Sequence, residues 1–105
     1  MDLLTHGASL ADLQDYVAKM EVERGLDHLA VDSQCLKLGE EVGELFRAVR
    51  KANGDPADPH GRVVDIGEER ANVLILVASI ANRKGIDLEA AFRAKEAKNN
   101  YRTWI

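Results

Sequence analysis

Residues 37–45 read Lys-Leu-Gly-Glu-Glu-Val-Gly-Glu-Leu, and this acidic stretch organises the rest of the chain. Residues three and four positions apart share a face of a helix, so Glu40, Glu41 and Glu44 lie on roughly one side. The same helix carries apolar residues expected in a core: Leu38, Val42, Leu45, Phe46 and Val49. Carboxylates so close to core positions are costly unless a cation offsets their charge. The stretch therefore predicts a site for a metal ion or a basic side chain, or else a solvated acidic face.

The chain has 105 residues, which predicts one domain over residues 1–105 with a loose lead-in at 1–8. Its formal net charge of −4 argues against a partner such as a nucleic-acid polymer or an anionic membrane. Cys35 is the only cysteine, so a reducing, cytoplasmic location is expected. No signal-peptide pattern opens the sequence, and the longest uncharged stretch, 71–82, is too short to span a bilayer.

Apolar periodicity and helix-ending glycines predict four helices and no strands. Ser9 is expected to cap the first helix, Asp32 or Ser33 the second, and Asp87 the fourth. A small core and short connections favour an antiparallel four-helix bundle, all-α in class and completed by oligomerisation. The expected helices cover residues 10–24, 33–52, 62–84 and 88–102.

The segment 54–61 contains both prolines of the chain and is the one clear loop that the sequence predicts. It follows the acidic helix directly. The loop therefore either connects two helices or overhangs a site beside that helix.

A second cluster of oxygen ligands lies in the third expected helix, where Glu69 and Asn72 repeat the three-residue spacing of Glu41 and Glu44. If the two helices pack antiparallel, these four side chains can face one another. An oxygen-only cage suits Mg²⁺ or Mn²⁺, which keep some waters for substrate phosphates. Zinc is not indicated, because the residues it favours are scattered without ligand spacing: Cys35, His6, His28 and His60.

The fourth expected helix offers a basic counterpart to this cage. Lys95, Lys98 and Arg102 fall three and four residues apart and so form one stripe. Basic side chains beside an acidic metal cage can hold a polyphosphate. The alternative is that the stripe is an ordinary solvated face.

Both acidic motifs together resemble those of the MazG-type all-α nucleotide pyrophosphohydrolases. The first motif is Glu-Glu-x-x-Glu at residues 40–44, and the second, usually Glu-x-x-Asp, is Glu-Arg-Ala-Asn at 69–72. The resemblance continues through 80–92 and through the basic segment 95–102, and so covers residues 10–102. A lone Glu-Glu-x-x-Glu is weak evidence, but both motifs in order, followed by the basic segment, are fairly specific.

The resemblance implies Mg²⁺-dependent hydrolysis of a nucleoside triphosphate to the monophosphate and pyrophosphate, as part of nucleotide-pool housekeeping. It implies Glu41, Glu44, Glu69 and Asn72 as metal ligands and Glu40 or Glu41 as the carboxylate that activates water. Lys95, Lys98 and Arg102 would hold the phosphates, and Asn99 would contact the base or ribose. Members of this family usually assemble as homodimers or homotetramers, with sites near subunit junctions.

The sequence departs from the family pattern at Asn72, because an asparagine can ligate through its carbonyl oxygen but supplies no charge. Two alternatives therefore stay open: hydrolysis of a related phosphoanhydride such as phosphoribosyl-ATP, and a non-catalytic module that binds a metal, a nucleotide or a partner. The Asn72→Asp variant would discriminate a weakened enzyme from such a module. Trp104 is expected to pack on its own bundle rather than on a base, and Cys35 lacks a histidine partner for nucleophilic chemistry.

Overall fold

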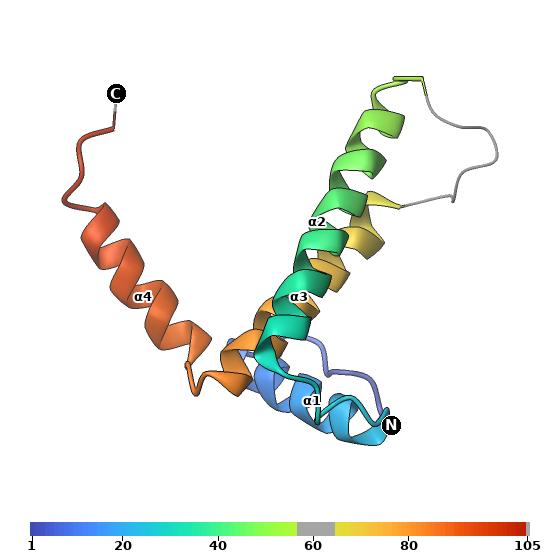
Figure 1. Cartoon of the computed structure of the whole chain (residues 1–105). Helices are drawn as coiled ribbons and strands as arrows, with labels where there is room; N and C mark the ends of the chain where they lie inside the picture. Colours follow the sequence, from blue (N-terminus) through green and yellow to red (C-terminus); the bar gives the residue numbers. More distant parts are fainter. Residues whose placement is uncertain (57–64, 105) are drawn as a thin grey trace. The chain divides into compact units, whose positions relative to one another are not determined.

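The computed structural model describes residues 1–56 and 65–104, and it contains four helices in this part of the chain (Figure 1). They are α1 (Leu10–Glu23), α2 (Val31–Ala52), α3 (Ile66–Arg83) and α4 (Leu88–Asn99). No strand occurs in these residues, which confirms the all-α class. None of the helices in the described ranges is long and apolar enough to cross a membrane.

The helices are distributed over two compact units. We call Leu29–Val77 the central unit; it contains α2 and the first part of α3. We call Met1–His28 with the chain from Ala78 onward the terminal unit; it contains α1, the last turns of α3, and α4. The single domain and the completion of the bundle by oligomerisation stay predictions.

The predicted cap of α1 is confirmed. The Ser9 hydroxyl accepts a hydrogen bond from the Asp12 backbone N–H at 3.1 Å, and the Asp12 carboxylate accepts one from the Ser9 N–H at 3.0 Å. This reciprocal pair is a capping box, which satisfies two backbone donors that a helix start leaves without partners.

Ser9→Ala is therefore expected to lower the free energy of unfolding by about 1 kcal/mol. Ser33→Ala is the matched control, because the start of α2 has no side-chain capping bond and Ser33 is exposed. Chemical denaturation of both variants checks this. Equal losses at the two serines would contradict a special role for the Ser9 cap.

The other helix starts differ in how well the sequence predicted them. Asp87 caps α4 as expected, with its carboxylate accepting from the Ala90 N–H at 3.1 Å. The predicted cap of α2 by Asp32 or Ser33 is wrong: α2 begins at Val31 behind Ala30, without a side-chain capping bond. Asp32 instead occupies the first turn, where the helix dipole favours a carboxylate.

The predicted third helix over 62–84 also begins later in the structure. Residues 62–64 lie outside the described residues, as does 57–61 of the predicted loop. Asp65 is not helical; its side chain accepts a hydrogen bond from the Glu68 N–H at 3.0 Å, in the manner of a cap. The α3 helix ends before Gly85, whose φ of +64° is a left-handed conformation that glycine adopts readily.

The terminal unit buries a small apolar core together with polar groups. Val17 and Met20 of α1 are buried, as are Ala78 and Ala81 of α3. Gln14 links three elements, because its side chain donates to Asn82 and to the Ile86 carbonyl and accepts from the Leu88 N–H. These bonds anchor the turn between α3 and α4 to α1.

In the central unit, α2 and the first part of α3 run antiparallel beside each other (Figure 1). The buried residues include Ala48, Gln34, Leu76 and Glu69.

The predicted burial of Phe46 and Val49 is wrong within the single chain, since they are 65% and 41% exposed. Glu41 lies on the face of α2 that meets α3. Phe46 follows it by five residues and so lies about 140° around the helix, away from that face.

Candidate active site

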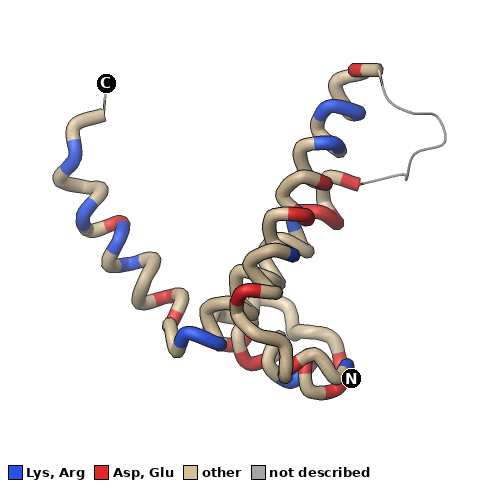
Figure 2. Tube along the Cα trace, in the orientation of Figure 1, with Lys and Arg blue, Asp and Glu red and all other residues tan. Residues whose placement is uncertain are grey.

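The central unit brings together three of the four predicted metal ligands. The side chains of Glu69 and Asn72, three residues apart on α3, lie close enough to Glu41 of α2 to act on the pKa of its carboxyl. Figure 2 shows acidic positions on both of these helices. The predicted meeting of the two acidic motifs is therefore found for Glu41, Glu69 and Asn72.

The acidic cluster, Glu41, Glu44, Glu69 and Asn72, is removed from solvent to different extents. Glu69 is only 2% exposed, whereas Glu41, Glu44 and Asn72 are partly buried. The Oε2 atoms of Glu69 and Glu44 are buried without a hydrogen-bond partner. Buried carboxylate oxygens without partners are costly. A cation beside these oxygens would offset that cost.

Burial raises the pKa of Glu41 above its ordinary value of 4.5, and the hydrogen bond and negative charge of Glu69 raise it further. The Asn72 hydrogen bond and the positive charge of Lys37 oppose this rise in pKa. When no cation is present, the Glu41 carboxyl therefore keeps its proton to a higher pH than a solvated glutamate does.

This rise in pKa predicts how the stability of the metal-free protein depends on pH. The folded state binds the Glu41 proton more tightly than the unfolded state, so this contribution is complete below pH 4.5 and is lost as pH rises through the folded pKa. Thermal unfolding in chelator, compared with that of Glu41→Gln, isolates the contribution. We expect the difference between the two proteins to grow as pH rises above 4.5. A difference independent of pH would contradict the raised pKa.

A hard divalent cation needs several oxygen ligands around it. Within 1–56 and 65–104, no three Asp, Glu, His or Cys side chains gather closely enough to hold a metal ion. Two glutamates in contact, with the Asn72 amide beside them, nevertheless fit Mg²⁺, which typically takes one or two carboxylates and completes its shell with water and substrate phosphates. The two partnerless oxygens of Glu44 and Glu69 support this fit.

The residues predicted to activate water differ in their surroundings. Glu41 lies in the cluster, whereas Glu40 is exposed on α2. Glu44 lies one turn beyond Glu41 on the same helix and keeps one buried oxygen without a partner. Their roles in catalysis or metal binding stay predictions.

The predicted phosphate-binding residues belong to the terminal unit. Lys95 and Lys98 are exposed on α4, in the basic run visible in Figure 2. The predicted helix over 88–102 is too long: α4 ends at Asn99, so the stripe does not continue along the helix to Arg102. The Arg102 guanidinium instead stacks over the Trp104 ring, 4.7 Å from its centroid. Such cation–π stacking stabilises the conformation of the segment that follows α4.

The predicted base or ribose contact, Asn99, lies at the end of α4. Its amide nitrogen donates to Glu96 at 3.0 Å, and its Oδ1 atom is buried without a hydrogen-bond partner. The Trp104 indole N–H donates to the Asn99 carbonyl at 3.3 Å, so Trp104 lies against its own helix end while staying 67% exposed.

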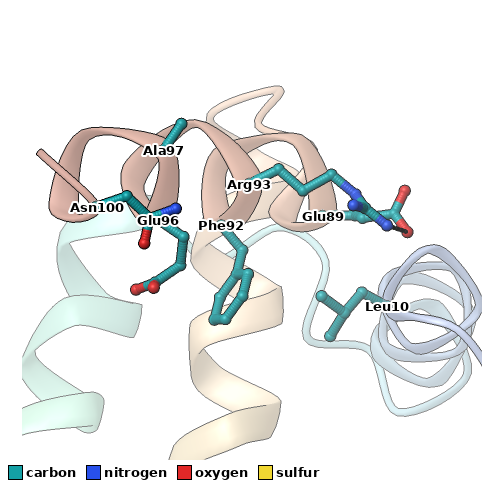
Figure 3. A pocket seen from close by; sticks show the side chains of 7 residues that line it. All are labelled: Leu10, Glu89, Phe92, Arg93, Glu96, Ala97 and Asn100. Atoms are coloured by element: carbon teal, nitrogen blue, oxygen red, sulfur yellow. Dashed lines mark ion pairs between the residues drawn. The ribbon is translucent and has the colours of Figure 1, made fainter.

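A pocket between α1 and α4 of the terminal unit lies on another face of α4 (Figure 3). Leu10 and Phe92 supply its apolar lining, and Glu96 and Asn100 are among its polar groups. None of the four predicted nucleotide-binding residues lines it. The pocket therefore does not correspond to the predicted phosphate site.

Lys37 is a charged neighbour of the site that the sequence interpretation did not assign. Its positive charge acts on Glu41 and partly opposes the rise in the pKa of that carboxyl. The signal was present in the sequence, because Lys37 precedes Glu41 by four residues, a spacing at which opposite charges on a helix attract.

The fold and the site together define the class: an all-α protein in which two antiparallel helices bring glutamates and an asparagine close together. The family model of the MazG nucleotide pyrophosphohydrolase domain matches residues 30–103, and the chain belongs to this family. The match includes α2, α3 and α4 and all the predicted site residues. Among the curated proteins compared with it, none matches the chain.

Proposed function

We propose that the protein hydrolyses a nucleoside triphosphate, NTP or dNTP, to the nucleoside monophosphate and pyrophosphate in a Mg²⁺-dependent reaction. Membership of the MazG family supports nucleotide pyrophosphohydrolase chemistry in general. The observation that carries the finer proposal is the contact of Glu41 with Glu69 and Asn72, next to buried oxygens without partners. Mn²⁺ is the alternative cation, because its oxygen-ligand preference is similar.

Glu41 and Glu69 would hold the cation, with Glu44 contributing from the next turn of α2. The cation would polarise the α-phosphoryl group and neutralise charge on the departing pyrophosphate. A free carboxylate beside it, Glu40 or a second oxygen of Glu41, would orient the attacking water and accept its proton. Water oxygen then bonds to the α-phosphorus as the bond to the α–β bridging oxygen breaks.

The basic residues of the terminal unit would bind phosphates of a substrate. Lys95, Lys98 and Arg102 carry the charges that a triphosphate needs, and Asn99 offers an amide for the base or ribose.

We further propose that the protein acts in the cytoplasm as a homodimer or homotetramer. The exposed Phe46 and Leu36 of α2 support such an assembly.

The test is pyrophosphate release from a panel of NTPs and dNTPs, with Mg²⁺, with Mn²⁺ and with chelator, and with phosphoribosyl-ATP included. We expect metal-dependent release from one or more nucleoside triphosphates. Release from phosphoribosyl-ATP alone would assign the chain to the alternative reaction. No release from any substrate, with metal still bound by calorimetry, would favour a non-catalytic binding module.

A further inference from the structure

The side chain of Gln14 in α1 connects three parts of the terminal unit. Its amide nitrogen donates to the Asn82 Oδ1 atom near the end of α3, at 3.0 Å, and to the Ile86 carbonyl in the turn that follows, at 2.8 Å. Its amide oxygen accepts from the Leu88 backbone N–H at 2.9 Å. A backbone carbonyl only accepts and a backbone N–H only donates, so Ile86 and Leu88 determine which way the amide is turned.

The bond to Leu88 acts on the start of α4. The first backbone N–H groups of a helix have no partner within it, and Leu88 is the first residue of α4. The Gln14 oxygen therefore serves as a cap that comes from another helix, in addition to the Asp87 carboxylate that accepts from the Ala90 N–H. Because the same glutamine also holds Ile86, it fixes the chain on both sides of Asp87.

Apolar packing contributes little to holding α4. No residue of this helix, which the structure describes from end to end, is buried, and Phe92 is 64% exposed. Phe92 and Leu10 of α1 line an open hollow of about 470 Å³ between the two helices (Figure 3). Helices in proteins are usually held by the packing of an apolar face. The direction of α4 therefore depends strongly on the hydrogen bonds at its start.

A small change in this direction would move the basic residues of α4. Lys98 lies in the last turn of the helix, and at about 1.5 Å of rise per residue it is about 15 Å from Leu88. A tilt of about 10° at Leu88 would displace Lys98 by about 2–3 Å, which is comparable with the length of a hydrogen bond. Such a displacement is enough to break a contact between a lysine and a phosphate oxygen.

We propose that Gln14 is a positioning residue, which fixes the direction of α4 through Ile86 and Leu88 and so places Lys95 and Lys98 for the phosphates of the substrate. This inference rests on the proposed function, because it takes these lysines as phosphate-binding residues. Gln14 lies outside residues 30–103, the part of the chain that the family model matches. Its contribution to the reaction is indirect, through α4.

Two variants of Gln14 and a matched control test this role. Gln14→Met removes all the side-chain hydrogen bonds and keeps a side chain of similar length. Gln14→Glu keeps an acceptor for the Leu88 N–H, loses both donated bonds, and provides a milder variant should Gln14→Met not fold. Ser9→Ala is the control, because it removes the cap of α1 and leaves the bonds to α4 in place.

Two readouts are needed. The first is the distribution of distances between spin labels at Lys19 of α1 and Ala94 of α4, both exposed, from pulsed electron paramagnetic resonance. The exposed Cys35 is replaced by serine in all these proteins, so that only the two chosen positions are labelled. The second readout is steady-state kinetics of the unlabelled variants with the best nucleotide substrate and Mg²⁺.

A positioning role predicts a clearly wider distribution of label distances in Gln14→Met, and the wild-type distribution in Ser9→Ala. KM should rise about 10-fold in Gln14→Met while kcat stays within about 2-fold, because the lysines bind the phosphates in the substrate and in the transition state alike. Gln14→Glu should show smaller changes in the same direction. A merely structural role would not separate KM from kcat in this way.

The wild-type distribution of label distances in both Gln14 variants would overturn the role of Gln14 in fixing α4. A wider distribution with an unchanged KM, or with a loss of kcat alone, would overturn its connection with the substrate. A wild-type protein that releases no pyrophosphate would overturn the proposed function and this connection with it, whereas the label distances would still show whether Gln14 fixes α4. The two failures are therefore distinguishable.

Discussion

Glu69→Gln is expected to lower kcat/KM for nucleotide hydrolysis at least about 100-fold, while the metal-free protein keeps its stability or gains some. Glu69 is 2% exposed, contacts Glu41 and keeps one buried oxygen without a partner. Altering even an outer partner of a metal site costs about 10–100-fold, so losing a ligand should cost no less. Glutamine fills the same volume, removes the like-charge contact and can donate to Glu41.

The matched control for this substitution is Glu68→Gln, one position earlier on α3. Glu68 is exposed, and its replacement should leave kcat/KM within about 2-fold of the wild-type value, because a solvated charge is screened by water and salt. Steady-state kinetics with Mg²⁺ and thermal unfolding in chelator measure both effects. Full activity in Glu69→Gln would contradict a role of Glu69 in holding the cation.

Arg83→Met is expected to have the largest effect on stability, a loss of about 3–5 kcal/mol in the free energy of unfolding. The Arg83 guanidinium donates to both carboxylate oxygens of Glu21, at 3.1 and 2.5 Å, and to the Leu26 carbonyl. The two side chains are 15% and 5% exposed. Removing the arginine leaves a buried carboxylate without its cation, which is why the expected cost is high.

The exposed pair Arg93–Glu89 on α4 provides the control for the buried one. The Arg93 Nη2 and Glu89 Oε1 atoms lie 3.7 Å apart and both side chains are more than half exposed, so Arg93→Met should change the free energy of unfolding by less than about 1 kcal/mol.

A Glu21→Leu/Arg83→Met double variant should recover much of the stability lost in Arg83→Met, because it removes both buried charges. Urea denaturation measures all three variants, and similar losses for Arg83→Met and Arg93→Met would contradict the account.

The sequence predicted well those features that local chemistry determines. Ser9 and Asp87 cap their helices through side-chain oxygens, and Gly85 follows α3 in a left-handed conformation. Helix periodicity, together with the assumed antiparallel packing of the two helices, predicted that Glu41 would lie near Glu69 and Asn72, as it does. These outcomes depend on residues within a few positions of one another, or on a regular helical repeat that extends over the whole element.

Other features depended on tertiary packing and could not be predicted in this way. The α2 helix begins behind Ala30, which has no capping side chain, so its start is not signalled by residue type. Phe46 is apolar but lies on an exposed face of α2, because the strip that α3 covers is narrower than the apolar pattern suggests. Arg102 follows the end of α4 and stacks on Trp104, a contact that a helical projection does not contain.

Within the acidic cluster, too, the features that depend on tertiary packing could not be predicted from the sequence. The spacing of Glu69 and Asn72 predicted two oxygen ligands on one face, but not which of them would be buried. That property follows from how α2 and α3 pack, which leaves Glu69 almost inaccessible to solvent.

The central claim is that the protein cleaves between the α- and β-phosphates of a nucleoside triphosphate, using the carboxylates of α2 and α3. The most direct measurement is phosphorus NMR of the products formed from the best substrate of the panel with Mg²⁺, by the wild-type protein and by Glu69→Gln. We predict resonances of nucleoside monophosphate and pyrophosphate with the wild-type protein, and unchanged triphosphate with the variant or in chelator. Nucleoside diphosphate and inorganic phosphate, or equal turnover by Glu69→Gln, would contradict the account.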